Sequence, residues 1–503
     1  MSQIYDLLVI GGGINGAGIA RDAAGRGLSV VLCEKGDLGS ATSSSSSKLI
    51  HGGLRYLEHY EFGLVREALI EREVLLKSAP HIIWPLEFIL PHSKAQRPAW
   101  LIRLGLFLYD HLGGRKILPS SKGVNLKRME SGKALKDNYL KAFSYSDCWV
   151  DDARLVVLNA MDAQSKGAKI LPKTECTSLK ALQDCNLWGA KLSNSITGES
   201  QDIQAKVVVN AAGPWVDKIL DQVSLPEREY RSRLVKGSHI VVPRLYKDKQ
   251  AYILQNDDGR IVFVLPYEGK FSLIGTTEED FTGDPSKAEI NSDEIEYLCE
   301  VVGKYFKKPP VPNNIVWSYS GVRPLVDDGD KSASTVTRDY ILDIQESHGL
   351  PILTIYGGKI TTFRKLSEHA MKILDDVLGR ETDTWTRDSF LPGGDLQTSD
   401  FKTFLRNFQT EFHWLPEGLS CRYARCYGRL ARKFLKNCKR LPDLGEFLGD
   451  DVYEAEIAYL VLKEWVKTVE DVLWRRTKLG LHVSPETVKN IERIVKKYLK
   501  EKE

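Results

Sequence analysis

The sequence has few of the features that accompany export, metal binding or membrane insertion. Its eight cysteines are scattered, with no Cys-x-x-Cys pair and no Cys/His cluster at metal-ligand spacing. The first residues run directly into an apolar strand pattern, without the basic start and cleavage site of a signal peptide. No apolar run approaches the roughly 18 to 20 residues that cross a bilayer as a helix. We therefore expect a cytosolic protein with reduced thiols, no metal and no membrane span.

A strong charge bias is also lacking. The chain has 70 Lys and Arg residues against 67 Asp and Glu residues, a formal net charge of +3. This balance gives no argument for nucleic-acid binding. Hydrophobic residues make up 42% and charged residues 27%, as in ordinary globular proteins. Because 503 residues exceed what one hydrophobic core usually supports, about three structural units are expected.

The N-terminal segment has the pattern of a βαβ unit. Residues 5–10 are an apolar, β-branched run, residues 15–26 have helical spacing, and residues 29–33 form a second apolar run. A serine-rich loop follows at 40–47, and residues 58–77 are a charged helical stretch. Apolar and glycine signals flank the serine loop, which favours an ordered loop over a flexible linker.

Gly11, Gly13 and Gly16, with the spacing G-x-G-x-x-G, follow the first strand and lie at the start of the helix. In this context the first glycine permits a tight turn, the second permits close approach to a pyrophosphate, and the third permits close packing of helix and strand. Glu34 ends the second strand, where its carboxylate can accept hydrogen bonds from a ribose 2′-hydroxyl. The unit therefore predicts a dinucleotide site for FAD or NAD.

Three later segments favour FAD over NAD. A buried-type strand at 207–210 closes on Ala211, Ala212 and Gly213, and a loop at 356–359 contains two glycines. With the serine loop, they offer backbone that can approach an extended flavin closely.

The rest of the chain divides into three kinds of pattern. Residues 151–166 have helical spacing and a strand-like region surrounds 173–182. Residues 234–277 alternate β-rich runs with Gly and Pro turns, which predicts an antiparallel sheet. Beyond the linker at 391–394 the composition shifts to helix formers, with many Arg and Lys residues in 422–440 and 488–502.

Six strings give the chain a specific resemblance. They are GGGINGAGIA at 11–20, SKLIHGGLRY at 47–56, KGSHIVVP at 236–243, SGVRPL at 320–325, TRDY at 337–340 and GGKITT at 357–362. Together, and in this order, they resemble the FAD-dependent glycerol-3-phosphate dehydrogenase family, bacterial aerobic type, over the whole chain. The resemblance implies an α/β fold: a glutathione-reductase-type, Rossmann-like FAD-binding domain, a β-rich substrate domain of the D-amino-acid-oxidase kind and a helical C-terminal domain. The expected boundaries are 1–75, 150–225 and 318–388 for the FAD domain, 76–149 and 226–317 for the substrate domain, and 389–503 for the cap.

The resemblance also nominates site residues. The residues expected to hold FAD are Gly11, Gly13, Ile14, Asn15, Gly16, Glu34, Thr42, Ser47, Lys48, Leu49, His51, Cys176, Ala212, Gly213, Trp215, Gly358, Lys359 and Thr361. The residues expected around the substrate are Arg55, Tyr56, His239, Arg323, Arg338 and Lys359, because cations suit a phosphate dianion.

The implied reaction oxidises the C2 alcohol of sn-glycerol 3-phosphate to dihydroxyacetone phosphate, with hydride transfer to FAD. His51 and His239 are both candidates for the base that takes the hydroxyl proton, and the residues leave that choice open. Arg323 and Lys359 are expected to stabilise developing negative charge.

The resemblance implies that electrons pass to ubiquinone or menaquinone at the cytoplasmic face of a bacterial inner membrane. Residues 97–109 are apolar and aromatic with cationic flanks, which fits either an interfacial helix or a buried one. A glycerol-3-phosphate oxidase releasing hydrogen peroxide, a soluble NAD-dependent dehydrogenase and a non-enzymatic nucleotide-binding protein are the alternatives. The sequence leaves the oligomeric state open, a homodimer included.

Overall fold

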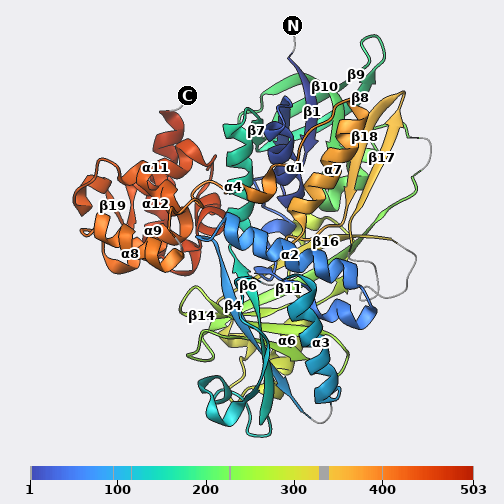
Figure 1. Cartoon of the computed structure of the whole chain (residues 1–503). Coiled ribbons are helices and arrows are strands. Elements are labelled where there is room, and N and C mark those ends of the chain that lie inside the picture. The colour runs from blue at the N-terminus through green and yellow to red at the C-terminus, as the bar shows by residue number, and fades with distance from the viewer. Residues whose placement is uncertain are drawn as a thin grey trace.

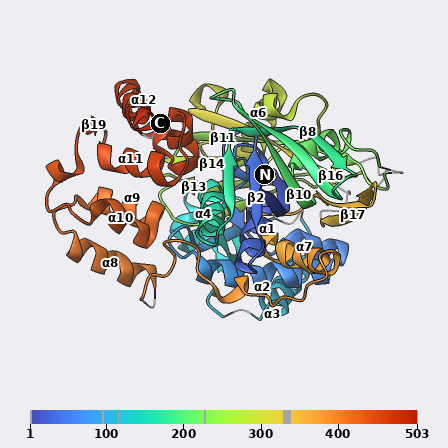
Figure 2. The same cartoon turned by 90° about the horizontal axis from the view of Figure 1, so that it is seen from above.

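The computed structural model describes residues 3–93, 96–114, 116–225, 228–327, 339–398 and 400–501. Two β-sheets and a helical C-terminal part make up this portion of the chain (Figure 1). Seen from two directions, the C-terminal helices lie beside helix α4 (Asp152–Ser165) and away from α7 (Phe363–Val377) (Figures 1 and 2). None of the described helices is long and apolar enough to cross a membrane.

The first sheet has eight strands in the described part of the chain. They are β1 (Ile4–Ile10), β2 (Val30–Glu34), β7 (Lys169–Pro172), β8 (Thr174–Leu182), β9 (Leu187–Asn194), β10 (Ser200–Asn210), β17 (Ile341–Ser347) and β18 (Leu350–Tyr356). The main path runs β17-β18-β10-β1-β2-β7, with β9 pairing to both β8 and β10. Neighbours β18, β10, β1, β2 and β7 are parallel.

Apolar residues on both faces explain why β1 is central. Leu7 and Val9 pack into one core with α1 (Ile14–Gly25), α4 and α7, whereas Leu8 packs into a second core with the β8–β9 hairpin. A parallel strand covered on both sides reads as a continuous hydrophobic run, as β1 does. The predicted strands at 5–10 and 29–33 and the helices at 15–26 and 151–166 are confirmed, with ends that differ by one or two residues.

The second sheet has ten described strands. They are β3 (Leu49–Ile50), β4 (Ile83–His92), β5 (Lys122–Asn125), β6 (Lys141–Val150), β11 (Ser232–Pro243), β12 (Ala251–Gln255), β13 (Ile261–Tyr267), β14 (Phe271–Gly275), β15 (Glu279–Asp280) and β16 (Trp317–Val326). All pairings are antiparallel except β4 with β12. The predicted antiparallel sheet over 234–277 is thereby confirmed, and it is larger than predicted.

Two strands of this sheet come from ranges expected in the FAD domain. β16 pairs with β11 over ten residue pairs, from Trp317 with Val241 to Val326 with Ser232, and β3 pairs with β6. The segments 1–75 and 318–388 therefore contribute strands to both sheets. The predicted domain boundaries themselves remain a prediction.

Helices cover both faces of the second sheet. α2 (Phe62–Ser78) and α3 (Ala99–Leu112) pack on one face through Val65, Leu69 and Leu106, and α6 (Ser292–Tyr305) packs on the other. Helix α6 begins with a capping box, in which Asn291 and Glu294 satisfy each other's backbone N–H groups.

The C-terminal part is helical, as predicted. It contains α8 (Phe401–Glu411), α9 (Glu417–Tyr427), α10 (Arg432–Leu435), α11 (Glu454–Lys463), a π-helix (Asp471–Arg476) and α12 (Pro485–Lys500), with a short hairpin β19 (Phe447–Gly449) and β20 (Val452–Tyr453). The helical run expected at 422–440 is broken at Gly428, whose φ is +52° and where a Cβ would lie 2.2 Å from the Gly393 carbonyl oxygen.

Candidate functional site

The glycine turn joins β1 to α1 under tight steric limits. Gly11 has a φ of +112°, and a Cβ there would lie 2.3 Å from the carbonyl oxygen of Ala211. A Cβ on Gly16 would lie 1.9 Å from the Gly11 carbonyl oxygen. The turn therefore brings β1, α1 and the end of β10 together, and it leaves the N-terminus of α1 at the wall of a cavity. The N-terminus of a helix suits a pyrophosphate, because its dipole favours negative charge.

Glu34 is fixed at the end of β2 by two backbone donors. Its carboxylate accepts hydrogen bonds from the Gly12 N–H at 2.7 Å and the Gly36 N–H at 2.6 Å. Burial raises the pKa of the carboxyl, and the two N–H groups act in the opposite direction by favouring the ionised form. A carboxylate has further acceptor sites, so Glu34 can still accept from ribose hydroxyls.

The serine-rich loop is ordered by contacts with distant elements. The Thr42 hydroxyl donates to the Val322 carbonyl at 2.5 Å, and Ser43 Oγ accepts from the Ile14 N–H at 3.0 Å. Farther along, the Lys48 ammonium lies 2.9 Å from Asp152, which also accepts from the Ser46 hydroxyl at 2.8 Å. The loop is thus held against β16, α1 and α4, as expected for an ordered segment.

A cavity of about 630 Å³ lies between the two sheets and is lined by the glycine turn, Glu34 and the serine loop. The predicted residues on its wall are Gly11, Gly13, Ile14, Asn15, Glu34, Thr42, Ser47, Leu49, His51, Arg55, Tyr56, Cys176, Ala212, Gly213, Trp215, Arg323, Gly358 and Lys359. Several segments, spread between residues 10 and 360 of the sequence, therefore meet at one cavity.

Three of the predicted cations line this cavity. Arg55, Arg323 and Lys359 line the cavity together with Tyr56, and the Lys359 ammonium lies 4.1 Å from the centroid of the Tyr56 ring. Arg323 also forms an ion pair with Glu278 at 3.4 Å. These side chains can bind a dianion, since guanidinium groups provide forked donors and an ammonium provides a point charge.

His239 lies behind the wall. Its Nε2 is 2.8 Å from the Ser47 hydroxyl, and its ring stacks on Tyr319 with centroids 4.8 Å apart. The side chain is buried, and burial lowers the pKa of its imidazole to about 3, with the Arg323 and Lys48 charges acting in the same direction. His51, by contrast, is on the wall, and its backbone N–H donates to Thr361 Oγ1 at 3.2 Å.

Four predicted residues support the wall without lining it. Gly16 packs against the glycine turn, Lys48 pairs with Asp152, Thr361 accepts from His51, and His239 contacts Ser47. The contacts expected from these side chains to a cofactor or substrate remain predictions. Arg338 lies outside the described residues.

Sequence reasoning missed several residues of the wall. They are Ser43, Phe88, Tyr145, Asp147, Ile253, Arg260, Phe263, Thr276 and Glu278. Most come from the second sheet, where neither a motif nor a charge pattern distinguishes a residue facing the cavity from one facing a helix. Ser43 is 29 positions from Ile14, from whose N–H it accepts a hydrogen bond, so no local signal placed it beside the start of α1.

The cavity fits FAD by its chemistry. The Asn15 side-chain oxygen is buried without a hydrogen-bond partner among the described residues, while its amide nitrogen donates to the Gly357 carbonyl at 3.1 Å. On this wall Glu34 can accept hydrogen bonds from a ribose, the N-terminus of α1 can bind a pyrophosphate, and Lys359 is one of the cations. A glycine-lined passage of this kind accommodates a long dinucleotide whose reactive ring meets a charged substrate.

The fold and this cavity define a class, the FAD-dependent oxidoreductases. The family profile described as "FAD dependent oxidoreductase" matches residues 6–364, which contain both sheets. A second profile, "C-terminal domain of alpha-glycerophosphate oxidase", matches residues 384–502.

Similar proteins indicate which family of FAD-dependent oxidoreductases the chain belongs to. The chain is 52% identical to D-erythritol 1-phosphate dehydrogenase of Brucella abortus over 482 residues, covering 96% of each chain. It is 50% identical to the aerobic glycerol-3-phosphate dehydrogenase of Escherichia coli over 501 residues, covering 99% of each. A solved structure of glycerol-3-phosphate dehydrogenase from Bacillus halodurans, complexed with FAD, superposes with a TM-score of 0.76 at 25% identity, covering 99% of this chain and 95% of that one.

The chain belongs to the FAD-dependent glycerol-3-phosphate dehydrogenase family. The predicted family, the predicted fold class and FAD as the cofactor are thereby confirmed.

Proposed function

We propose that this flavoenzyme oxidises a secondary alcohol of a small phosphorylated polyol, and that the polyol is sn-glycerol 3-phosphate. The observation that carries the proposal is that Arg55, Arg323 and Lys359 all line the cavity that Gly358 and the glycine turn also line. Guanidinium and ammonium groups suit a phosphate dianion, whereas a neutral polyol without the phosphate offers them no charge to bind. The relative in E. coli bears the corresponding name. The product is dihydroxyacetone phosphate.

Each residue of the wall has its own role in the proposed reaction. FAD, when bound, accepts the hydride from the alcohol carbon. Arg55 and Lys359 hold the phosphate, and Arg323 stabilises negative charge on the alcohol oxygen as its proton leaves. His51 is the better candidate for the base, because it lines the cavity whereas His239 lies behind Ser47. His239 then orients the Ser47 hydroxyl.

D-Erythritol 1-phosphate is the second candidate substrate, because the Brucella relative with that name is as similar as the E. coli one. It is longer than glycerol 3-phosphate by one carbon and one hydroxyl. Thr276 and Glu278 on the same wall offer polar groups for an additional hydroxyl. The ratio of kcat/KM for the two substrates distinguishes the candidates.

We further propose that electrons leave to a membrane quinone, either ubiquinone or menaquinone, with the protein bound peripherally at the cytoplasmic face of the membrane. The support is helix α3, at the predicted segment 97–109. Trp100, Leu104 and Phe107 are 68%, 48% and 51% exposed along one side of it. Exposed aromatic and aliphatic residues on one helix, with cations nearby, suit a lipid interface. Replacing Trp100 and Phe107 with Ser should abolish co-sedimentation with anionic liposomes and leave activity with a soluble dye unchanged.

An anaerobic titration followed by flavin absorbance tests the proposal. Glycerol 3-phosphate should bleach the bound flavin, and glycerol, which lacks the phosphate, should not. Quinone should then restore the colour quickly, and oxygen only slowly. Rapid recovery in oxygen with peroxide release would instead favour an oxidase, and no bleaching by either polyol phosphate would refute the proposed substrate class.

A further inference from the structure

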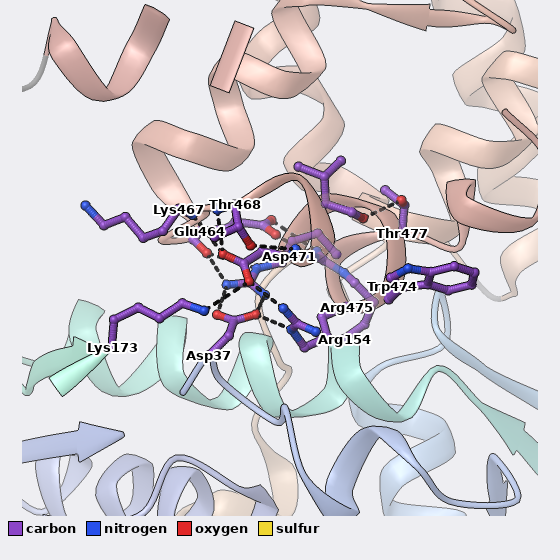
Figure 3. A network of polar contacts seen from close by, with 12 residues as sticks. Asp37, Arg154, Lys173, Glu464, Lys467, Thr468, Asp471, Trp474, Arg475 and Thr477 are labelled. Atoms are coloured by element: carbon purple, nitrogen blue, oxygen red, sulfur yellow. Dashed lines mark hydrogen bonds and ion pairs between the residues drawn. The ribbon is translucent and has the colours of Figure 1, made fainter. Parts of the chain in front are cut away.

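One short segment of the C-terminal part reaches the cofactor-binding part. In the π-helix Asp471–Arg476, the Arg475 Nε lies 2.5 Å from Asp37 Oδ2, and Arg476 donates to both Asp37 oxygens at 2.6 and 2.8 Å. Arg475 also pairs with Asp471, which lies 3.5 Å from the Lys173 ammonium (Figure 3). The Asp37 and Arg476 side chains are fully buried. These charges therefore interact in a medium that screens them poorly.

Asp37 belongs to the turn that holds Glu34. The Gly36 N–H donates to the Glu34 carboxylate at 2.6 Å, and the Gly39 N–H donates to the Gly12 carbonyl at 2.9 Å. The Asp37 carbonyl accepts from the Ser40 N–H at 3.0 Å. Glu34, Gly36 and Ser40 all line the cavity. A displacement of Asp37 would thus move the glycine turn and the ribose acceptor together.

The π-helix and the residues that follow it have two further contacts outside the C-terminal part. Trp474 stacks on Trp317, the first residue of β16, with ring centroids 4.2 Å apart. The Lys478 ammonium lies 3.5 Å from Asp151, whose neighbour Asp152 holds the serine loop. Residues 471–478 therefore contact Asp37 in the turn beside Glu34, Asp151 beside the residue that holds the serine loop, and the first residue of the strand that carries Arg323.

We propose that Arg475 and Arg476 are positioning residues for FAD. By holding Asp37 they fix the 34–40 turn in the geometry that accepts the ribose, so docking of the C-terminal part and binding of FAD favour each other. Two events that share one ordered element are coupled to the same extent in both directions. The C-terminal part then contributes to cofactor retention without touching the cofactor.

Three variants separate this role from general stability. Asp37→Asn removes the charge that both arginines bind, and Arg475→Gln weakens the same contact while keeping the Arg476 pair. Glu456→Gln is the matched control. It removes an equally buried carboxylate that pairs with Arg422 and accepts from Tyr427, entirely inside the C-terminal part.

The first measurement is the rate of FAD release from diluted holoenzyme, followed by flavin fluorescence. We expect release to be roughly tenfold faster in Asp37→Asn, the factor that corresponds to losing one charge-assisted hydrogen bond. Arg475→Gln should give a smaller increase, and Glu456→Gln should stay within about twofold of wild type. With excess FAD, kcat and KM should be unchanged in all three.

The second measurement is amide hydrogen exchange in FAD-saturated holoenzyme. Exchange at residues 34–40 should be faster in Asp37→Asn and in Arg475→Gln, and unchanged in Glu456→Gln. The proposal is overturned if Glu456→Gln releases FAD as fast as the other two, or if both contact variants keep wild-type release rates. If Asp37→Asn does not fold, Arg475→Gln alone decides between these outcomes.

Discussion

Replacing Lys48 with Met should destabilise the protein by about 3 kcal/mol, because it breaks a buried ion pair from one side. The Lys48 ammonium lies 2.9 and 3.0 Å from the two carboxylate oxygens of Asp152, and it donates to the Ser44 carbonyl at 3.1 Å. The two paired side chains are 1% and 0% exposed. Losses of this kind are typically about 3 to 5 kcal/mol. The lower end applies here because Asp152 keeps donors from the Ser46 hydroxyl at 2.8 Å and the Ala153 N–H at 2.9 Å.

The assay is urea unfolding of the holoenzyme at a fixed excess of FAD, with the free energy of unfolding as the readout. The double variant Lys48→Met/Asp152→Asn should cost less than the sum of the single variants, because it leaves no unpaired charge. A Lys48→Met protein within about 0.5 kcal/mol of wild type would refute the reasoning, since that is the range of an ordinary surface substitution.

Three further results are expected. Gly13→Val should give a folded but colourless protein, because only Ser43 Oγ lies near a Cβ there, at 3.2 Å, while a larger side chain enters the cavity; absorbance at flavin wavelengths checks this, and retained flavin would contradict it. Arg323→Ala should raise KM or severely lower kcat in steady-state assays while keeping the yellow flavin; normal kinetics would remove Arg323 from the site. Burial lowers the pKa of His81 to about 3, with Arg154 and Arg425 acting in the same direction. The unfolded chain therefore binds more protons between about pH 3 and pH 6.5, and this group makes stability fall as pH falls through that window, by about 1.4 kcal/mol per pH unit. Urea unfolding of His81→Gln at pH 5 and pH 7 should show a correspondingly shallower dependence, and equal slopes would argue against a depressed pKa.

The N-terminal unit could be predicted because its signals are local. The apolar run of β1, the glycines of the turn and Glu34 at the end of β2 lie within 31 residues of one another, from Ile4 to Glu34. Strand, turn and helix each follow from near neighbours in the chain, so their order alone defined the nucleotide site. The later glycine-containing segments then favoured FAD, and the family strings narrowed the substrate to glycerol 3-phosphate.

The supporting contacts could not be predicted because their partners are far apart in sequence. Lys48 meets Asp152 across 104 positions, and Arg475 meets Asp37 across 438. Lys48 was expected to hold the cofactor together with other residues of the loop, which remains a prediction; its ion pair with Asp152 depends on the packing of α4 against the loop, which no local signal indicates. The break at Gly428 did leave a signal, because a glycine inside a helical run is a common helix end.

The strand order of the first sheet affects the synthesis of the protein. β10 pairs with β18 through Val208, Val209 and Asn210, the residues that lead to the cofactor loop. β18 begins at Leu350, roughly 140 residues after β10 ends, which is roughly 7 to 28 s of translation. During that interval the nascent chain has an open strand edge beside an incomplete flavin site. An unpaired edge of this kind is a site for aggregation, so a chaperone that shields it on the ribosome would raise the yield of folded protein.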